Sequence, residues 1–465
     1  MIRLMNKALH HPASFRDPSG FVFEQDGKIY RQVNQCYADH YRLLQSSGLY
    51  SSLTGTGKLI AHTELQENLL LSGDWFLTLL PEQIEFISYP YEWCFDQLKD
   101  AALLTLDIVR EAVAHGMILK DATPFNIQFT GSKPVFIDTL SFEKYDASAP
   151  WVAYRQFAEC FVAPLLLASY RSPELIRLLQ LYPDGIPLQI AAKLLPFKSR
   201  FNFNVFLHIF LPLHVVSPSE KVDKKHLKFS RQKFINIINS LHTLISRLEL
   251  KRIKSTWNDY YSNTVSGNDY VNRKKKIVEE WLELVHGNTV LDIGTNTGLF
   301  ARQACAKFLN VIAIDTDSRC INDLYRESRK SVHSKILPLC IDMSAPTPAI
   351  GWNNEERDDF FSRYKADVVF ALALIHHIAI SKNIPIRDIA EKLSRLCNFL
   401  IIEFVPKNDP KVIMMLQSRK DVFQEYTETL FEDSFSAYFV IQQKQKIDPT
   451  DRILYLMKKK ITASA

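Results

Sequence analysis

The most chemically informative stretch of the sequence is a short turn bracketed by Gly294 and Gly298, which follows an apolar, β-branched run. Glycines allow the backbone to approach a ligand closely, and the helix predicted over residues 299–309 offers unpaired N–H groups at its start. Dinucleotide-binding folds use a similar strand, turn and helix, but Asn296 stands where their motif has its second glycine. The turn is therefore a candidate ligand-binding element, made up of Asp292, Gly294, Asn296 and Gly298.

A second carboxylate ends the apolar run 311–315, about one helix and one turn after Gly298. At this strand end Asp315 can accept hydrogen bonds from both hydroxyls of a ribose, as the acidic residue of dinucleotide-binding folds does. Asp317 lies two residues further on and is either a supporting group or the N-cap of the next helix. Asp315 is the stronger candidate for the ribose because it lies immediately at the strand end.

Candidate catalytic residues follow two later apolar runs. His376 and His377 come directly after residues 366–375, and Glu403 lies near the end of residues 399–404. Histidine has a pKa suited to proton transfer near neutral pH. A carboxylate and a histidine across one pocket could orient a nucleophile or bind a cationic substrate. The sequence does not rank the two histidines, and one of them could simply pack or cap a helix.

These residues require a particular framework. Apolar strands alternate with helical segments along the C-terminal half, which predicts an α/β fold with a doubly wound parallel sheet. The carboxyl ends of parallel strands meet at one edge of such a sheet, where ligands bind. The predicted strands cover 289–293, 311–315, 335–342, 366–375 and 399–404. All the candidate residues of this half lie at or near that edge.

The segment Val-Leu-Asp-Ile-Gly-Thr-Asn-Thr-Gly at 290–298 resembles the first motif of class I S-adenosylmethionine (SAM) methyltransferases, V-L-D-x-G-x-x-x-G. The resemblance implies a Rossmann-like sheet and SAM as the cofactor. It also places Asp342 beside the adenine amino group, with Met343 packed on the ring. The alternative for Asp342 is a turn residue ahead of Ser344.

Further segments make residues 256–456 similar to the SAM-dependent methyltransferases of the NoeA-type nodulation-protein group. They are Ala-Leu-Ala-Leu-Ile-His-His at 371–377, Ile-Ile-Glu-Phe-Val-Pro-Lys-Asn-Asp-Pro at 401–410, and the segments 419–426 and 431–435. The resemblance implies transfer of a methyl group to an oxygen or nitrogen nucleophile. The acceptor is unidentified, a small molecule or a glycan. If the reaction needs a base, His376 or His377 is the best candidate.

The N-terminal half carries a separate group of candidate site residues. Asp121 and Asn126 have D-x-x-x-x-N spacing, and Asp138 closes an apolar run twelve residues later. This resembles the catalytic loop and metal-binding aspartate of protein-kinase-like and aminoglycoside-phosphotransferase-like folds, which implies an α+β kinase-like domain. A glycine-rich phosphate loop is missing from residues 20–33, and Thr139 replaces the usual aromatic residue. We therefore expect a degenerate domain in which Asn126 and Asp138 are at most the remnant of a metal site.

Two alternatives to a simple methyltransferase follow. One is a bifunctional kinase-methyltransferase that modifies a glycan or a lipid-linked sugar. The other is a non-catalytic regulatory protein that binds SAM without turnover. Binding of Mg-ATP to the N-terminal half would favour the first, and SAM binding without methyl transfer would favour the second.

Length and composition are those of an ordinary globular protein: 465 residues, 47% hydrophobic, with a formal net charge of +5. We predict a kinase-like domain over 1–216, a basic helical connector over 217–255 and a methyltransferase domain over 256–465. The apolar segment 205–216 is too short to span a bilayer and is interpreted as a buried helix or partner surface, with a peripheral membrane contact as the less favoured alternative. The seven scattered cysteines form no C-x-x-C pair and suit the cytoplasm. Nucleic acid is not expected as a partner, and the oligomeric state is not indicated.

Overall fold

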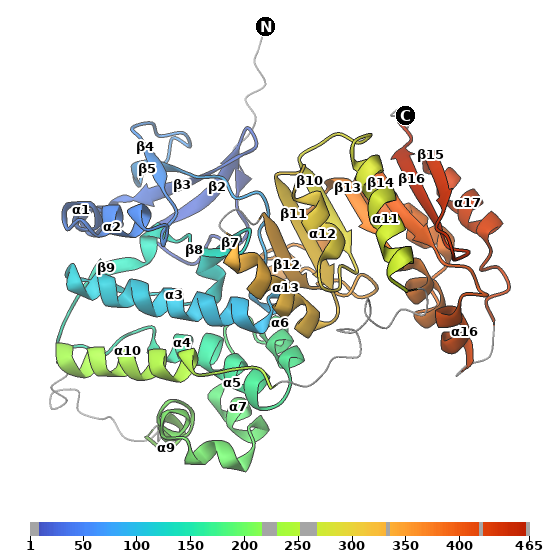
Figure 1. Ribbon diagram of the computed structural model, residues 1–465. Coiled ribbons are helices and arrows are strands. Elements are labelled where there is room, and N and C mark those ends of the chain that lie inside the picture. Colours follow the sequence, from blue (N-terminus) through green and yellow to red (C-terminus); the bar gives the residue numbers. More distant parts are fainter. Residues whose placement is uncertain (1–8, 216–229, 252–266, 332–334, 418–421, 462–465) are drawn as a thin grey trace, which may run out of the picture. The chain divides into compact units, whose positions relative to one another are not determined.

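The computed structural model describes residues 9–215, 230–251, 267–331, 335–417 and 422–461. By its internal contacts the chain divides into two compact units. Unit 1 comprises Met1–Arg252 together with the short segment Ala349–Asp358. Unit 2 comprises Ile253–Pro348 and Asp359–Ala465. Figure 1 shows the helices and strands of both units.

Unit 1 begins with a five-stranded antiparallel sheet in the order β1-β2-β3-β5-β4. Asp26 and Gly27, both with positive φ, turn the chain between β2 and β3 in a tight hairpin. Tyr41 of helix α1 (Ala38–Ser46) and Tyr37, which directly precedes this helix, pack on the sheet in a cluster that includes Leu140. The strands are β1 (Leu9–His10), β2 (Gly20–Gln25), β3 (Lys28–Asn34), β4 (His62–Leu65) and β5 (Trp75–Pro81).

The rest of unit 1 is mainly helical. The long helix α3 leads into two small antiparallel sheets, β6-β9 and β7-β8, and then into a series of shorter helices. The helices are α1 (Ala38–Ser46), α2 (Leu49–Gly55), α3 (Phe95–Ala114), α4 (Tyr154–Phe157), α5 (Ala163–Tyr170), α6 (Leu178–Leu181), α7 (Leu188–Leu194), α8 (Phe203–Val205), α9 (Leu211–Val215) and α10 (Arg231–Ser246). The strands are β6 (Met117–Leu119), β7 (Ile127–Thr130), β8 (Lys133–Phe136) and β9 (Phe142–Lys144).

Two parts of unit 1 differ from what the sequence pattern suggests. Helix α10, which lies in the predicted connector 217–255, packs along α3 and so belongs to unit 1 (Figure 1). The segment Ala349–Asp358 also belongs to unit 1, although it lies inside the predicted methyltransferase domain. Arg16 holds it by two hydrogen bonds to Glu356, at 2.9 and 2.6 Å. A single contiguous boundary between the halves therefore does not describe the chain.

Unit 2 contains a seven-stranded sheet in the order β12-β11-β10-β13-β14-β16-β15. The first five strands are parallel, and β16 runs antiparallel to both β14 and β15. Every residue of β10 is buried, as expected for a central parallel strand. The strands are β10 (Thr289–Ile293), β11 (Asn310–Asp315), β12 (Ile336–Cys340), β13 (Ala366–Ala371), β14 (Cys397–Phe404), β15 (Phe439–Lys446) and β16 (Ile453–Lys459). The predicted α/β class and Rossmann-like sheet are confirmed.

Helices cover the faces of this sheet, and one core joins them. Tyr270 and Trp281 of α11 pack with Val290 of β10, Phe300 of α12 and Phe370 of β13. The helices are α11 (Gly267–Leu282), α12 (Leu299–Ala304), α13 (Ser318–Lys330), α14 (Phe360–Arg363), α15 (Ile386–Leu396), α16 (Pro410–Gln417) and α17 (Glu428–Ser436). Because α11 precedes β10 in the chain and packs against it, its side chains can reach the carboxyl edge of the sheet.

Two elements end earlier than predicted. Helix α12 stops at Ala304 rather than near residue 309, because the chain must turn back to begin β11 at Asn310. Strand β13 stops at Ala371 rather than at residue 375, because Ala373 has a φ of 55° that strand geometry does not allow. The second change moves His376 and His377 from a strand end to the start of a helical turn.

The segment 205–216, as far as the structure describes it, forms a helical stretch in which Val205 and Ile209 are buried. Across the described ranges, none of the helices has both the length and the hydropathy that crossing a bilayer requires.

The tight turn before α12 gives a direct test of the fold. Gly298 has a φ of 79°, and a Cβ there would lie 2.3 Å from Cδ1 of the buried Leu324. Gly298→Ala should therefore lower the free energy of unfolding by about 2–4 kcal/mol, measured by urea denaturation. Gly73→Ala, where a Cβ meets nothing within 4 Å, is the control and should change it by less than about 0.5 kcal/mol. Equal effects of the two substitutions would contradict the turn geometry.

Candidate active site

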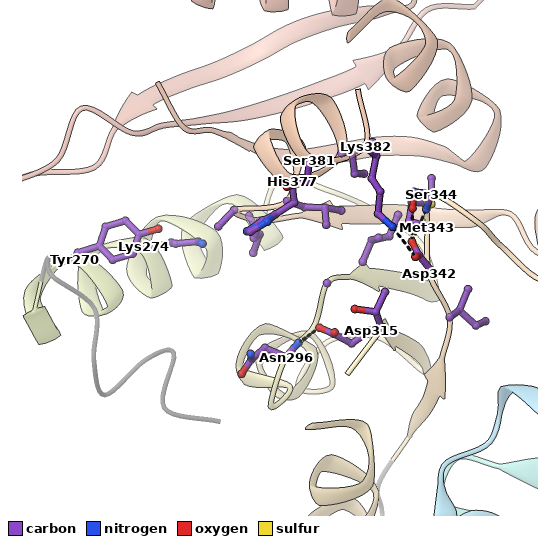
Figure 2. Close-up of a pocket in the computed structure, with 18 residues that line it drawn as sticks. Tyr270, Lys274, Asn296, Asp315, Asp342, Met343, Ser344, His377, Ser381 and Lys382 are labelled. Carbon is purple, nitrogen blue, oxygen red and sulfur yellow. Dashed lines mark hydrogen bonds and ion pairs between the residues drawn. The ribbon is translucent and has the colours of Figure 1, made fainter. Parts of the chain in front are cut away.

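A cavity of about 410 Å³ opens at the carboxyl edge of the parallel strands of unit 2, a size typical of small-molecule sites. Figure 2 shows side chains reaching it from the turn after β10, the end of β11, the segment after β12, the turn after β13 and helix α11. The lining includes Tyr270, Lys274, Gly294, Asn296, Asp315, Asp342, Met343, Leu374, His377 and Lys382. Most of the predicted cofactor-binding residues thus lie around one cavity.

The glycine turn closes one side of this cavity. Gly294 has a φ of 75°, and a Cβ there would lie 3.2 Å from Leu374, which also lines the cavity. Its N–H donates to the carbonyl of Ile314, which fixes the turn to β11 at 2.9 Å. Asn296 has a φ of 51° and its backbone N–H donates to Asp315 at 2.8 Å. The turn therefore leaves a backbone surface facing the cavity.

Two residues of the predicted cofactor set support the turn without lining the cavity. The side chain of Asp292 is buried and accepts a hydrogen bond from the Thr295 hydroxyl at 2.6 Å. Burial raises the pKa of Asp292 to about 6. Gly298 packs against Leu324 instead of facing the cavity. Both residues shape the turn, which brings Gly294 and Asn296 to the ligand side.

Asp315 has the surroundings of a hydroxyl-binding carboxylate. One oxygen accepts from the N–H of Asn296 at 2.8 Å and the other from the N–H of Asp317 at 2.9 Å. Burial raises its pKa, although these backbone N–H groups oppose the shift. Each carboxylate oxygen has more than one lone pair, so both oxygens can also accept from a diol in the cavity. The side chain of Asp317 instead caps α13, accepting from Arg319 N at 2.9 Å and Cys320 N at 3.2 Å.

Asp342 stabilises a turn and also lines the cavity. It accepts hydrogen bonds from the N–H and hydroxyl of Ser344, at 2.8 and 2.6 Å, and so stabilises a turn. With Met343 it also lines the cavity, where Lys382 lies 3.4 Å away (Figure 2). Burial alone would raise the pKa of Asp342, but the bonds from Ser344 and the charge of Lys382 outweigh it and lower this pKa.

The two histidines occupy different surroundings. His377 lines the cavity, whereas His376 is fully buried behind it, with ring centroids 4.2 Å apart. Burial lowers the pKa of His377 to about 4, and it lowers the pKa of His376 well below the ordinary value. Neither ring nitrogen of His376 has a hydrogen-bond partner among the described residues. Both imidazoles are neutral at physiological pH, and only His377 faces the site.

Glu403 does not form the open rim that its strand position suggests. It is fully buried and pairs with Lys274 at 2.5 Å and Arg452 at 3.4 Å, and Tyr270 donates to it at 2.5 Å. Arg452 in turn forms a two-point pair with Asp409, at 2.8 and 3.1 Å. Burial by itself would raise the pKa of Glu403, but Lys274 and Arg452 hold it below the ordinary value. Glu403 is thus an ionised carboxylate neutralised by two cations.

Sequence reasoning did not identify Tyr270, Lys274 or Arg452 as part of the site. Tyr270 and Lys274 lie four residues apart on α11, so their side chains leave one face of the helix. A lysine at that position, in an otherwise apolar face, was the available signal. Arg452 comes from the loop before β16 and carries no motif. Tyr270 and Lys274 form one end of the cavity (Figure 2), and Arg452, which does not line it, donates to the Tyr270 hydroxyl at 2.9 Å.

In unit 1, the candidate residues Asp121, Asn126 and Asp138 also lie together. Ser141 donates to Asp138 and receives a hydrogen bond from Asn126 at 3.4 Å. Burial raises the pKa of Asp121, and the nearby charge of Asp138 adds to the effect. Arg31 of β3, which the sequence analysis did not identify, forms an ion pair directly with Asp138. The described residues contain no group of three or more His, Cys, Asp or Glu placed to hold a metal ion.

The carboxylate of Asp315 gives a test of cofactor binding. Asp315→Ala removes the charge-assisted hydrogen bonds that a ribose diol would donate, a loss of about 1.5–3 kcal/mol in total. The affinity for SAM should fall about tenfold to a hundredfold, measured by calorimetry. Asp317→Ala removes a carboxylate two residues away that caps α13, and should leave the affinity nearly unchanged. Unchanged affinity in Asp315→Ala would rule out the assignment.

Comparison with known proteins adds the relationship of the whole chain. No protein-family model matches it. Nodulation protein NoeA of Rhizobium meliloti (strain 1021) is 33% identical over 452 residues, which cover 95% of this chain and 94% of that protein.

Similar solved structures include the N-methyltransferase NodS from Bradyrhizobium japonicum WM9, at 10% identity and a TM-score of 0.31. The match covers 42% of this chain and 99% of that one. The bifunctional kinase-methyltransferase WbdD is 17% identical, with a TM-score of 0.29, covering 46% of this chain and 45% of that one. TM-scores of this size add nothing to the fold established by the sheet order.

The order of the strands, the glycine turn and the strand-end carboxylates around one cavity are those of a class I SAM-dependent methyltransferase. The predictions of the enzyme class and of SAM as the cofactor are therefore confirmed. With one third of its residues identical over nearly the full length of both proteins, the chain belongs to the NoeA family of nodulation proteins.

Proposed function

We propose that unit 2 transfers the methyl group of SAM to an oxygen or nitrogen nucleophile of a small-molecule or glycan acceptor. The observation that carries this proposal is the single cavity in which Gly294, Asp315, Met343 and His377 meet. The first three fit an adenosine-containing ligand, and His377 adds a proton acceptor at the same site. SAM supplies an activated methyl group when bound, so the protein need only position the nucleophile.

Each lining residue has a role in this proposal. Asp315 accepts from the ribose hydroxyls, and Asp342 with Met343 receives the adenine. Lys274 and Tyr270 form a wall whose charge is balanced by the buried Glu403. Holding two reactants in the right geometry can lower a reaction barrier by about 7–11 kcal/mol. This reduction is larger than the one that a single proton acceptor gives. Juxtaposition in a partly desolvated cavity is therefore the main source of the rate.

His377 is the proposed base, and His376 supports its position from behind. The pKa of about 4 keeps the His377 imidazole neutral and able to accept a proton across physiological pH. The same low pKa makes it a weak base, which favours a nucleophile that loses its proton easily during the transfer. His376 contacts the His377 ring but does not line the cavity.

The two histidines can be separated by experiment. His377→Ala should lower methyl transfer about a hundredfold or more while SAM affinity changes little. The assay follows radiolabelled methyl groups from SAM into a small-molecule and glycan extract. His376→Leu is the control: it should retain turnover within about tenfold, because an apolar side chain of similar size fills the same buried site.

The pH profile sharpens this test. A base works in its unprotonated form, and His377 loses that form only as the pH falls through its pKa of about 4. Methyl transfer by the native chain should therefore stay level from pH 8 down to about pH 5.5 and not decline near 6.5, the usual histidine value. Full turnover in His377→Ala would show that transfer proceeds without a base.

For unit 1 we propose a degenerate kinase-like domain without phosphotransfer activity. Its support is the antiparallel sheet followed by helices, with Asp121, Asn126 and Asp138 in one cluster. In live enzymes of this kind the last aspartate holds Mg²⁺ at the phosphates. Here the guanidinium of Arg31 already pairs with Asp138, and the ion pair is only slightly exposed. Arg31 and a metal ion would compete for the same carboxylate.

The native chain should therefore hydrolyse no detectable ATP in the presence of Mg²⁺, in a coupled assay that measures ADP release. Arg31→Ala removes the cation that pairs with the Asp138 carboxylate. If any variant binds Mg-nucleotide weakly, we expect it to be this one. Robust ATP turnover by the native chain, lost in Asp138→Asn, would contradict this proposal and favour the bifunctional alternative. Tight SAM binding without methyl transfer to any acceptor would instead favour a regulatory protein.

A further inference from the structure

Three phenylalanines stand exposed on one short segment of unit 1. Phe197, Phe201 and Phe203 have 71%, 78% and 74% of their surface accessible. They lie in the 3₁₀ turn Phe197–Phe201 and at the start of α8, between α7 and α9. In Figure 1, α7 and α9 (green) lie at the end of unit 1 remote from the sheet strands β2–β5. Exposed aromatic side chains gathered in this way mark a contact surface far more often than isolated ones do.

The exposure is built into the segment. Ser199 and Val205, which alternate with the phenylalanines, are fully buried and anchor the chain. Asn202 caps α8 by accepting from Asn204 N at 3.1 Å and Val205 N at 3.2 Å. Since the backbone is fixed on its inner side, the three phenyl rings are held outward.

Cations accompany these rings. Lys193, Lys198 and Arg200 are exposed. The guanidinium of Arg200 lies over the Phe197 ring at 5.5 Å and over the Phe210 ring at 5.0 Å. Between residues 185 and 219 the sequence contains no aspartate or glutamate. All the Asp, Glu, Lys and Arg side chains of this segment are therefore basic, and they lie close in sequence to the exposed phenylalanines.

We propose that this aromatic patch (Phe197, Phe201 and Phe203 with Lys193, Lys198 and Arg200) docks unit 1 on an anionic lipid surface. Phenylalanines that insert at the level of the headgroups, together with basic residues that meet lipid phosphates, are the composition of interfacial membrane anchors. The described helices offer no membrane-spanning candidate, so the contact would be peripheral.

A second copy of the chain fits this patch less well. In a symmetric dimer the same residues face each other, so the cations of one patch would meet those of its copy. Like charges brought together without acidic partners oppose association. Lysine is also depleted in the cores of protein interfaces, whereas a lipid surface supplies the opposite charge.

The test is co-sedimentation of the full chain with phosphatidylcholine vesicles that contain or lack phosphatidylglycerol. The native chain should bind the anionic vesicles, and binding should weaken at high salt. Replacing Lys193, Lys198 and Arg200 with glutamine should lower partitioning about a hundredfold, at about fivefold for each cation. The triple variant Phe197→Ser, Phe201→Ser and Phe203→Ser should lower it at least about tenfold.

The matched control is Phe15→Ser, Leu71→Ser and Val152→Ser, which removes three other exposed apolar side chains of unit 1. It should bind vesicles like the native chain, and circular dichroism should show both serine variants folded. Absence of native binding, or equal binding to neutral and anionic vesicles, would overturn the proposal. So would dimerisation, detected by light scattering, that disappears in the phenylalanine variant.

Discussion

The structure of unit 2 depends on one buried network of ion pairs, centred on Glu403. Glu403, at the end of a central strand, has lost its contact with water and can remain charged only because Lys274 and Arg452 surround it. Removing one partner of such a buried pair typically costs about 3–5 kcal/mol, since it leaves a charge uncompensated. The arrangement joins α11, β14 and the loop before β16, three elements that are distant in sequence. One face of α11 is thereby fixed at the edge where the ligand cavity lies.

This constraint explains how the cavity acquires its two sides. The glycine turn and Asp315 form one side through backbone geometry, which is local in sequence. Tyr270 and Lys274 form the other side, and their orientation is set by Glu403 and Arg452. The charge of the site is therefore balanced before any ligand enters. A cationic cofactor such as SAM would meet a wall without a large net charge, and in the proposed binding mode Asp315 provides the directional contact.

The parts of this picture that follow local patterns could be predicted from the sequence. The β10 strand, the hairpin around Asp26 and the position of Asp315 at the end of β11 each depend on a few adjacent residues. The roles of Lys274 and Arg452 could not, because they pair with Glu403 across 129 and 49 residues. The predicted role of Glu403 as an open rim residue failed for the same reason: its strand position was right, but its partners were unknown. The ion pair of Arg31 with Asp138 likewise joins residues 107 apart in the sequence. The segment Ala349–Asp358 belongs to unit 1 through contacts that no sequence motif predicts.

The most direct test of the account is a crystal structure of the full chain with S-adenosylhomocysteine, the product that remains after methyl transfer. The account predicts the ribose hydroxyls within hydrogen-bond distance of both Asp315 oxygens, the adenine beside Asp342 and Met343, and the sulfur facing the His377 side of the cavity. The ion pairs of Glu403 should be unchanged. Binding elsewhere on the chain, or in this cavity with the ribose away from Asp315, would contradict it.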